Sequence, residues 1–238
     1  MRSSYSAVIF DLFGTLVPPY RHHDVLAEMA VALRVDPHRF IPVFSVETRE
    51  ARETGKATLE ENLRDICHRL GHVADSARIE EAAAMRRRFT HASLAPRGDA
   101  LQVLSDLKAA GFSIGLISDC CEAVSELWES TSLAPYIDAA ILSFRVGVRK
   151  PQRRIYDLGC VALSVEPSRC IYVGDGGSHE LTGAVRAGID AVLLRVESEI
   201  DLDPYRPDAR TWKGPAIESL SALVHVLRDG RRPTRRWS

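Results

Sequence analysis

The residues with chemical potential in this 238-residue chain gather at the ends of apolar, strand-like runs. The first run, Ala7-Val8-Ile9-Phe10, ends in Asp11, and Gly14 and Thr15 follow within four residues. A carboxylate at the carboxyl end of a buried parallel strand lies where open α/β sheets bind ligands. Such a carboxylate can act as a covalent nucleophile or as a metal ligand. The structural alternative is an aspartate that only caps the turn after the strand.

Three further runs lead to polar residues of complementary types. The second run ends in Ser118-Asp119, the third precedes Lys150-Pro151, and the fourth ends in Gly174-Asp175. Because the carboxyl ends of parallel strands meet at one edge of a sheet, we expect these groups to converge with Asp11. This set of groups suits attack on a phosphate ester. One carboxylate would attack, a hydroxyl and an ammonium would hold the phosphoryl oxygens, and a second carboxylate would help to bind a divalent cation.

The elements that position these residues alternate between strand and helix. Such alternation predicts βαβ units and an α/β fold, a Rossmann-like parallel sheet with helices on both faces. The predicted strands are residues 7–11, 113–118, 137–143, 170–174 and 191–195. The predicted helices of this part are residues 99–110, 122–130, 153–163, 181–187 and 220–228.

The first strand is separated from the second by a long stretch that reads as helix throughout. Residues 18–95 are therefore predicted to form a helical subdomain inserted after the first strand. Within it, Thr58 followed three residues later by Glu61 is typical of a capping box at a helix start. His22 and His23 lie just inside the insert, where they either face a substrate or are solvated loop residues.

The ordered set of motifs resembles the haloacid dehalogenase-like hydrolases. The motifs are Asp-Leu-Phe-Gly-Thr at 11–15, Ser118, Lys150-Pro151 and Gly-Asp-Gly-Gly-Ser-His-Glu at 174–180. The resemblance covers essentially the whole chain. It implies a Rossmann-like catalytic core of residues 1–17 and 96–238 and an α-helical cap of residues 18–95.

The resemblance also implies roles for individual residues. Asp11 would be the nucleophile that forms an aspartyl intermediate, while Ser118 and Lys150 bind the transferring group. The substrate-binding residues that it implies are Gly14, Thr15, Ser118, Asp119 and Lys150.

A metal site follows from the same resemblance. It implies Mg²⁺ held by Asp11, Asp175 and the carbonyl of Phe13. Glu180 takes the place of the second acidic residue of the fourth motif, in an outer shell.

Phe13 departs from the pattern of the phosphatases in this family. They usually carry an aspartate there, which protonates the leaving group and later activates water. With an aromatic residue at this position, the first motif resembles that of the 2-haloacid dehalogenases. Those enzymes displace halide, which needs neither a proton from the enzyme nor a metal. Asp175 argues the other way, because those dehalogenases generally lack this carboxylate.

Three functions therefore stand side by side. The first is Mg²⁺-dependent hydrolysis of a small phosphate monoester through an aspartyl-phosphate. The alternatives are metal-independent dehalogenation of a short 2-haloacid through an aspartyl ester and a catalytically weakened binding protein. A phosphonate-cleaving branch would need a Schiff-base lysine, for which Lys56 is the single candidate in the insert.

Composition narrows the class of partner and the compartment. The formal net charge is −1, which gives no global field for nucleic acid or an anionic membrane, and no stretch has the roughly 18 apolar residues that span a bilayer. The five cysteines form no CxxC pattern, and the N-terminal residues do not read as a charged-then-apolar leader. These two observations predict reduced thiols in a cytoplasmic protein. We expect a small-molecule substrate, whereas the oligomeric state cannot be predicted. The basic residues 228–238 are expected to be a solvated terminus.

Overall fold

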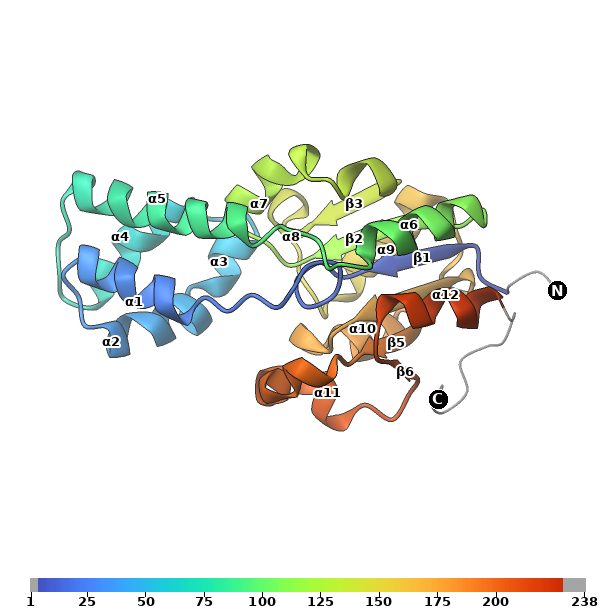
Figure 1. Cartoon of the computed structure of the whole chain (residues 1–238). Helices are drawn as coiled ribbons and strands as arrows, with labels where there is room; N and C mark the ends of the chain where they lie inside the picture. The colour runs from blue at the N-terminus through green and yellow to red at the C-terminus, as the bar shows by residue number, and fades with distance from the viewer. Residues whose placement is uncertain (1–3, 229–238) are drawn as a thin grey trace.

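A twisted parallel sheet forms the centre of the protein in the computed structural model, which describes residues 4–228 (Figure 1). Within these residues the sheet has six strands in the order β3-β2-β1-β4-β5-β6. The strands are β1 (Ala7–Phe10), β2 (Ser113–Ser118), β3 (Ala139–Leu142), β4 (Cys170–Gly174), β5 (Asp190–Leu194) and β6 (Ala216–Ile217). The predicted α/β class is confirmed. The basic tail after residue 228 lies outside the described residues.

Helices cover both faces of the sheet, so its inner strands are apolar on both sides. In β1, Val8 and Phe10 belong to one hydrophobic cluster, whereas Ala7 and Ile9 belong to another on the opposite face. Helices α6 (Ala100–Ala109) and α12 (Leu220–Arg228) pack on the first face, and α9 (Arg153–Leu163) and α10 (Glu180–Arg186) on the second. Burial on both faces is the reason that the strands read as continuous apolar runs.

The order of the strands places the ligand site. β1 pairs with β2 on one side and with β4 on the other, all in parallel. The chain thus adds β2 and β3 on one side of β1 and later β4, β5 and β6 on the other side. A change of side of this kind opens a crevice at the carboxyl ends of the strands. Asp11 is the residue that follows β1 in this crevice.

A separate unit of helices lies beyond the carboxyl end of the sheet, at the left of Figure 1. It comprises α1 (His23–Ala32), α2 (Pro37–Pro42), a π-helical turn (Val43–Glu47), α3 (Arg49–Glu53), α4 (Leu59–Arg69) and α5 (Ser76–Ala92). The unit has its own hydrophobic cluster, to which Leu26, Phe40, Leu63 and Ile79 contribute. The capping box at Thr58 and Glu61 is present at the start of α4.

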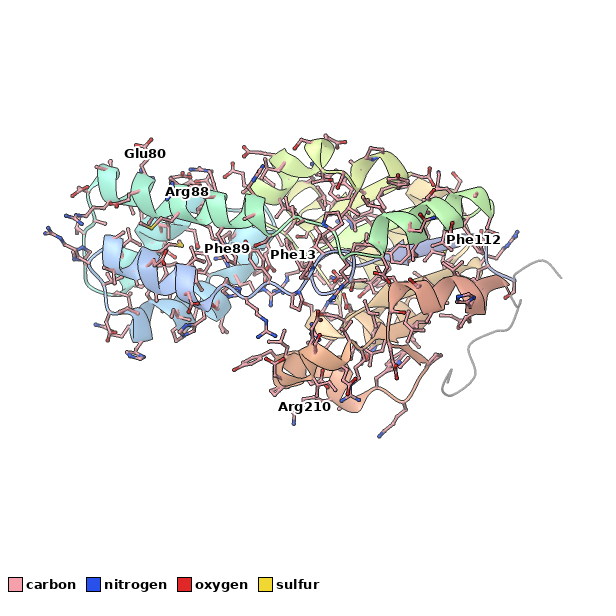
Figure 2. The ribbon with its side chains drawn as sticks, viewed as in Figure 1. Phe13, Glu80, Arg88, Phe89, Phe112 and Arg210 are labelled. Atoms are coloured by element: carbon pink, nitrogen blue, oxygen red, sulfur yellow. The ribbon has the colours of Figure 1, made fainter. Side chains whose placement is uncertain are left out.

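Aromatic rings join the α1–α5 unit to the core. The ring of Tyr20 lies 4.6 Å from that of Phe13 and 5.0 Å from that of Phe89 in α5. Figure 2 shows Phe13 and Phe89 together at this junction. The Tyr20 hydroxyl makes a 2.7 Å hydrogen bond with the Thr90 hydroxyl. The segment between β1 and α1 is therefore attached to α5 by both the ring and the hydroxyl of Tyr20.

Short elements complete the chain; those within residues 122–130 fall in a predicted helix, and the others were not predicted. They are α7 (Glu122–Leu127), α8 (Ser143–Val146), α11 (Pro207–Thr211) and the 3₁₀ segments Trp128–Ser130, Ala134–Tyr136, Pro167–Arg169, Gly177–His179 and Glu197–Tyr205. β6 escaped prediction because two residues are too few for a strand pattern. Within residues 4–228, no helix has the length and apolarity to cross a membrane. The five cysteines are free thiols.

Candidate active site

Asp11 is buried where β1 ends, and its neighbours hold it in place. Its backbone N–H donates to the Val173 carbonyl over 2.9 Å, which continues the ladder between β1 and β4. The Thr15 hydroxyl donates to Asp11 Oδ2 over 3.2 Å. Gly14 has φ +86°, and a Cβ there would lie 2.0 Å from Asp175 Oδ2. The motif glycine therefore allows the turn after β1 to approach the turn after β4.

Lys150 joins the carboxylate of Asp11, which follows β1, to that of Glu180, the first residue of α10. Its Nζ lies 2.5 Å from Asp11 Oδ1 and 2.6 Å from Glu180 Oε2. Its backbone N–H donates to Asp119 Oδ1 over 2.9 Å, which fixes the loop that carries it. The convergence of Asp11, Asp119 and Lys150 is the arrangement that the strand order requires.

Glu180 is fully buried in the cluster. Its Oε1 accepts from the Gly176 N–H over 3.0 Å, and its Oε2 accepts from the Tyr172 hydroxyl over 2.9 Å as well as from Lys150. Ligand atoms of Asp11, Asp175 and Glu180 all lie within 4.8 Å of one another. Oxygen donors of this kind suit a hard divalent cation, so the residues present fit a metal ion. That Phe13 offers its carbonyl to such an ion stays a prediction.

The carboxylates in this cluster are short of compensating positive charge. Burial raises the pKa of Asp11 to about 6, helped by the charge of Asp175 and opposed by Lys150. Burial, followed by the charge of Asp11, raises the pKa of Glu180 well above its usual range. Although burial opposes its charge, Asp11 and Glu180 hold the pKa of Lys150 above the usual range, so the ammonium persists. A further cation near Asp11 and Asp175 would relieve the repulsion between the carboxylates.

Ser118 is buried at the end of β2, and its Oγ has no hydrogen-bond partner among the described residues. An unpaired buried hydroxyl is costly unless a ligand or water satisfies it. The next residue, Asp119, faces the cavity and also lies 3.6 Å from Arg149 Nη2.

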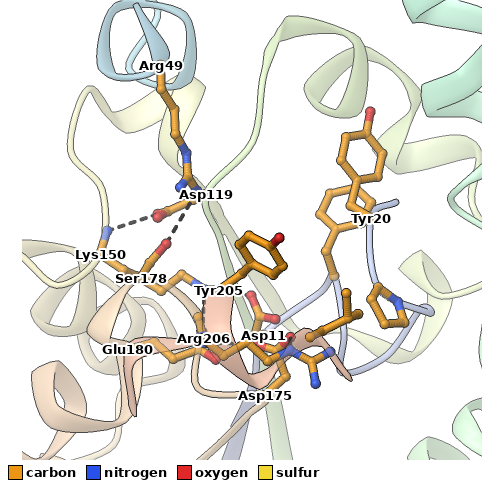
Figure 3. Close-up of a pocket in the computed structure, with 14 residues that line it drawn as sticks. Asp11, Tyr20, Arg49, Asp119, Lys150, Asp175, Ser178, Glu180, Tyr205 and Arg206 are labelled. Carbon is orange, nitrogen blue, oxygen red and sulfur yellow. Dashed lines mark hydrogen bonds and ion pairs between the residues drawn. The ribbon is translucent and has the colours of Figure 1, made fainter. Parts of the chain in front are cut away.

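A cavity of about 270 Å³ opens over Asp11 (Figure 3). Its lining residues are Asp11, Phe13, Pro19, Tyr20, Arg49, Asp119, Lys150, Asp175, Gly177, Ser178, Glu180, Leu202, Tyr205 and Arg206. Of the substrate-binding residues implied from sequence, Asp119 and Lys150 line the cavity, whereas Gly14, Thr15 and Ser118 are not among its lining residues.

Two arginines that sequence analysis missed enter the cavity from different segments. Arg49 belongs to α3, where its Nε lies 2.7 Å from Glu53 Oε1 and its Nη2 donates to Ser178 Oγ over 3.3 Å. Arg206 follows the 3₁₀ segment Glu197–Tyr205, and its Nε lies 2.7 Å from Asp175 Oδ2. For Arg49, the available signal in the sequence was its place on a short predicted helix of the insert. For Arg206 there was none, because residues 196–212 carry no periodic pattern.

The loop after β4 contains local backbone strain. Ser178 and His179 have φ of 52° and 54°, a region that residues with a Cβ rarely occupy. This turn leads into α10 and carries Ser178 to the cavity wall. Strain of this kind is characteristic of binding and catalytic loops.

The histidines of the insert do not line the cavity, so the structure gives them no contact with a substrate there. His22 lies with its ring 5.5 Å from that of Tyr20, and burial together with the charge of Arg86 lowers its pKa to about 4. His23 is exposed beside Asp24. Lys56 is exposed as well and pairs with Glu50 over 2.9 Å. Phe13 does line the cavity, and its ring offers no exchangeable proton.

The parallel sheet, with carboxylates and a lysine gathered in a cavity at its carboxyl edge, defines an α/β protein with a candidate active site at the strand ends. A family model described as haloacid dehalogenase-like hydrolase matches residues 5–188, and the chain belongs to this family.

Relatives of both chemistries are found. A glyceraldehyde 3-phosphate phosphatase from Methanopyrus kandleri is 25% identical over 85% of this chain and 89% of its own length. An (S)-2-haloacid dehalogenase from Burkholderia cepacia is 24% identical over 95% of this chain and 96% of its own. The structure of an L-2-haloacid dehalogenase from Xanthobacter autotrophicus superimposes with a TM-score of 0.60 at 20% identity, covering 94% of this chain and 98% of that one. The last likeness concerns the fold.

Proposed function

We propose that the protein is a Mg²⁺-dependent phosphatase that hydrolyses a small phosphate monoester. The observation that carries the proposal is the cluster of Asp11, Asp175 and Glu180, whose ligand atoms lie within 4.8 Å of one another. A carboxylate nucleophile and a phosphate dianion repel each other at short range, so such a reaction needs a cation at this place. The similarity to the Methanopyrus phosphatase supports the same function.

In the proposed reaction Asp11 attacks phosphorus while the bond to the ester oxygen breaks. The leaving oxygen takes a proton from water, and a water molecule then cleaves the aspartyl-phosphate to regenerate Asp11 and release inorganic phosphate. Bound Mg²⁺, held by Asp11 and Asp175, would supply positive charge beside the phosphoryl oxygens. Lys150, 2.5 Å from Asp11, orients the nucleophile and binds a phosphoryl oxygen.

Ser118 has a supporting role in this proposal. Its unpaired, buried Oγ is available to donate to a phosphoryl oxygen. Gly14 and Thr15 act indirectly, because they shape the turn that presents Asp11.

We propose that residues 18–95 serve as the cap of the site and select the substrate. The support is that Pro19, Tyr20 and Arg49 of this stretch line the cavity over Asp11. A cavity of about 270 Å³ suits a small metabolite and not a polymer such as nucleic acid. Closure of a cap would exclude water and hold the leaving group.

Dehalogenation of a short 2-haloacid is the second candidate. The specific observation in its favour is the apolar pair of Phe13 and Tyr20 beside the nucleophile, with ring centroids 4.6 Å apart. Halide needs no proton when it leaves, so the phenyl ring is no handicap to that reaction. The Burkholderia relative fits this chemistry.

A substrate panel separates these functions. Purified protein is assayed with phosphorylated metabolites, p-nitrophenyl phosphate and 2-haloacids, each with Mg²⁺ and with chelator. We expect phosphate release that chelator abolishes and Mg²⁺ restores. Halide release that persists undiminished in chelator would establish the dehalogenase instead. If folded protein turned over neither class, a binding role would replace both.

A further inference from the structure

Asp175 has both carboxylate oxygens engaged in the structure. Oδ1 accepts from the Gly177 N–H over 2.9 Å, and Oδ2 lies 2.7 Å from Arg206 Nε. Lys150 serves the other two carboxylates of the cluster, Asp11 and Glu180. Among the described residues, the ion-pair partner of Asp175 is thus the guanidinium of Arg206.

Arg206 is fixed in this position by a chain of charged contacts. Its Nη2 lies 3.2 Å from Glu199 Oε2, and Arg97 Nη1 lies 2.7 Å from Glu199 Oε1. Arg97 in turn donates to the carbonyls of Gly14 and Thr15 over 2.9 Å each. Arg206 and Asp175 are both more than nine-tenths buried. The contacts connect the segment before α11 to the turn that follows the nucleophile strand.

We propose that Arg206 is a built-in counter-ion of the metal site. It neutralises Asp175 when no divalent ion is bound, and it competes with the ion for this carboxylate, so that it sets the metal affinity. The inference rests on the proposed divalent-ion site and concerns a residue outside the four sequence motifs.

The physical reason is that two cations cannot share one buried carboxylate without repulsion. An ion that ligates Asp175 meets the positive guanidinium at the same carboxylate, at a distance where charges interact strongly in a buried site. Glu199 gives Arg206 a second partner 3.2 Å away, to which the guanidinium can remain attached when Asp175 turns to the ion. Loss of Arg206 should therefore tighten metal binding, whereas loss of Glu199 should weaken it.

The test is calorimetric titration of the full chain with MgCl₂. We expect Arg206→Gln to lower the Mg²⁺ dissociation constant by about tenfold or more, since one competing charge is removed. Arg206→Lys keeps the charge and should stay near wild type, and Glu199→Gln should bind more weakly. Arg195→Gln is the matched control, because Arg195 pairs with Asp203 in the same segment over 2.7 Å and does not reach Asp175.

Thermal unfolding gives a second readout that is independent of turnover. In chelator, Arg206→Gln should melt below wild type, and Mg²⁺ should raise its melting temperature by more than it raises that of wild type. If Arg206→Gln does not fold in chelator, Glu199→Gln carries the test, because it should raise the Mg²⁺ dissociation constant whereas Arg195→Gln should not.

Unchanged or weaker Mg²⁺ binding by folded Arg206→Gln would overturn the inference, as would Mg²⁺ binding by Glu199→Gln that equals or exceeds that of wild type. Failure of all these proteins to bind Mg²⁺ would overturn it too. Turnover of p-nitrophenyl phosphate is measured separately and judges the phosphatase function. Protein that shows the expected order of affinities and yet hydrolyses no phosphate would support the counter-ion and contradict the proposed function.

Discussion

We expect Phe13 to determine which leaving groups the proposed phosphatase can expel. It lines the cavity two residues after Asp11 and packs on Tyr20, where a carboxylate would be able to exchange protons. A missing general acid costs about 10²–10⁴ in rate for leaving groups that need protonation. Acidic leaving groups lose less, because they depart as anions.

The substitution Phe13→Asp tests this role. Wild type should hydrolyse p-nitrophenyl phosphate faster than an alkyl phosphate, and the variant should narrow that ratio by about tenfold or more by supplying the proton. Kinetics of both substrates with Mg²⁺ present measure the ratio. Phe13→Leu, which keeps an apolar side chain, is the control and should keep the wild-type ratio.

The same substitution distinguishes the two reactions. In a dehalogenase, a carboxylate at position 13 would enter an apolar site and repel the carboxylate of a 2-haloacid. Haloacid turnover by Phe13→Asp should then fall. An unchanged alkyl-to-aryl ratio in the well-folded variant would show that the proton is delivered from elsewhere.

At the scale of elements, two segments meet over the strand ends. α3 brings Arg49 from the α1–α5 unit, and the segment before α11 brings Tyr205 and Arg206 from the core (Figure 3). Arg49 also contacts Ser178 in the strained loop after β4. A substrate in the cavity would lie between these two segments. We therefore expect Arg49 of α3 to contact the leaving group.

Arg49→Gln tests the part played by α3. We expect KM to rise by about tenfold for phosphate esters with an anionic leaving group and to change little for neutral ones, because the loss of one partly exposed charge weakens anion binding. Steady-state kinetics over the phosphate panel check this. Lys56→Gln is the matched control, since Lys56 is an exposed cation of the same unit that does not line the cavity. An identical substrate ranking in Arg49→Gln and wild type would exclude α3 from substrate selection.

At the scale of the whole molecule, the site lowers stability for the sake of chemistry. Asp11 has a pKa of about 6 in the folded protein, against a usual value of 3.8. A carboxyl whose pKa is raised by folding destabilises the protein when ionised, and this penalty disappears as the pH falls from about 6 to about 3.8.

Asp11→Asn should therefore separate stability from activity. We expect less than about a hundredth of wild-type turnover, because the amide cannot attack. In chelator at pH 7.5 the variant should melt at or above the temperature of wild type, and the difference should shrink toward pH 4. Calorimetric melts over this pH range measure it. Suppose that Asp11→Asn melts at a lower temperature than wild type at pH 7.5 and that this difference disappears in acid. That result would contradict the proposal that ionised Asp11 destabilises the folded protein.

The strand ends were predictable from the sequence, and the structure confirms the α/β class. Asp11, Ser118 and Asp175 each follow or end a run of apolar residues, and such runs are a local property of strands buried on both faces. Parallel pairing then requires the carboxyl ends to meet, so the approach of Asp11, Lys150 and Asp175 follows from the order of the elements. The roles of these residues stay predictions.

Tertiary structure alone decided what surrounds that edge. Arg49 and Arg206 are 157 positions apart in the sequence, and no local pattern in either segment indicates that both side chains reach the same cavity. The left-handed turn at Ser178 and His179 sets the start of α10 so that the Glu180 carboxylate reaches Lys150, and the place of Glu180 in an outer shell of the metal stays a prediction. Side-chain partners of this kind depend on how elements pack, because charge pairing is decided by distances in space and not along the chain.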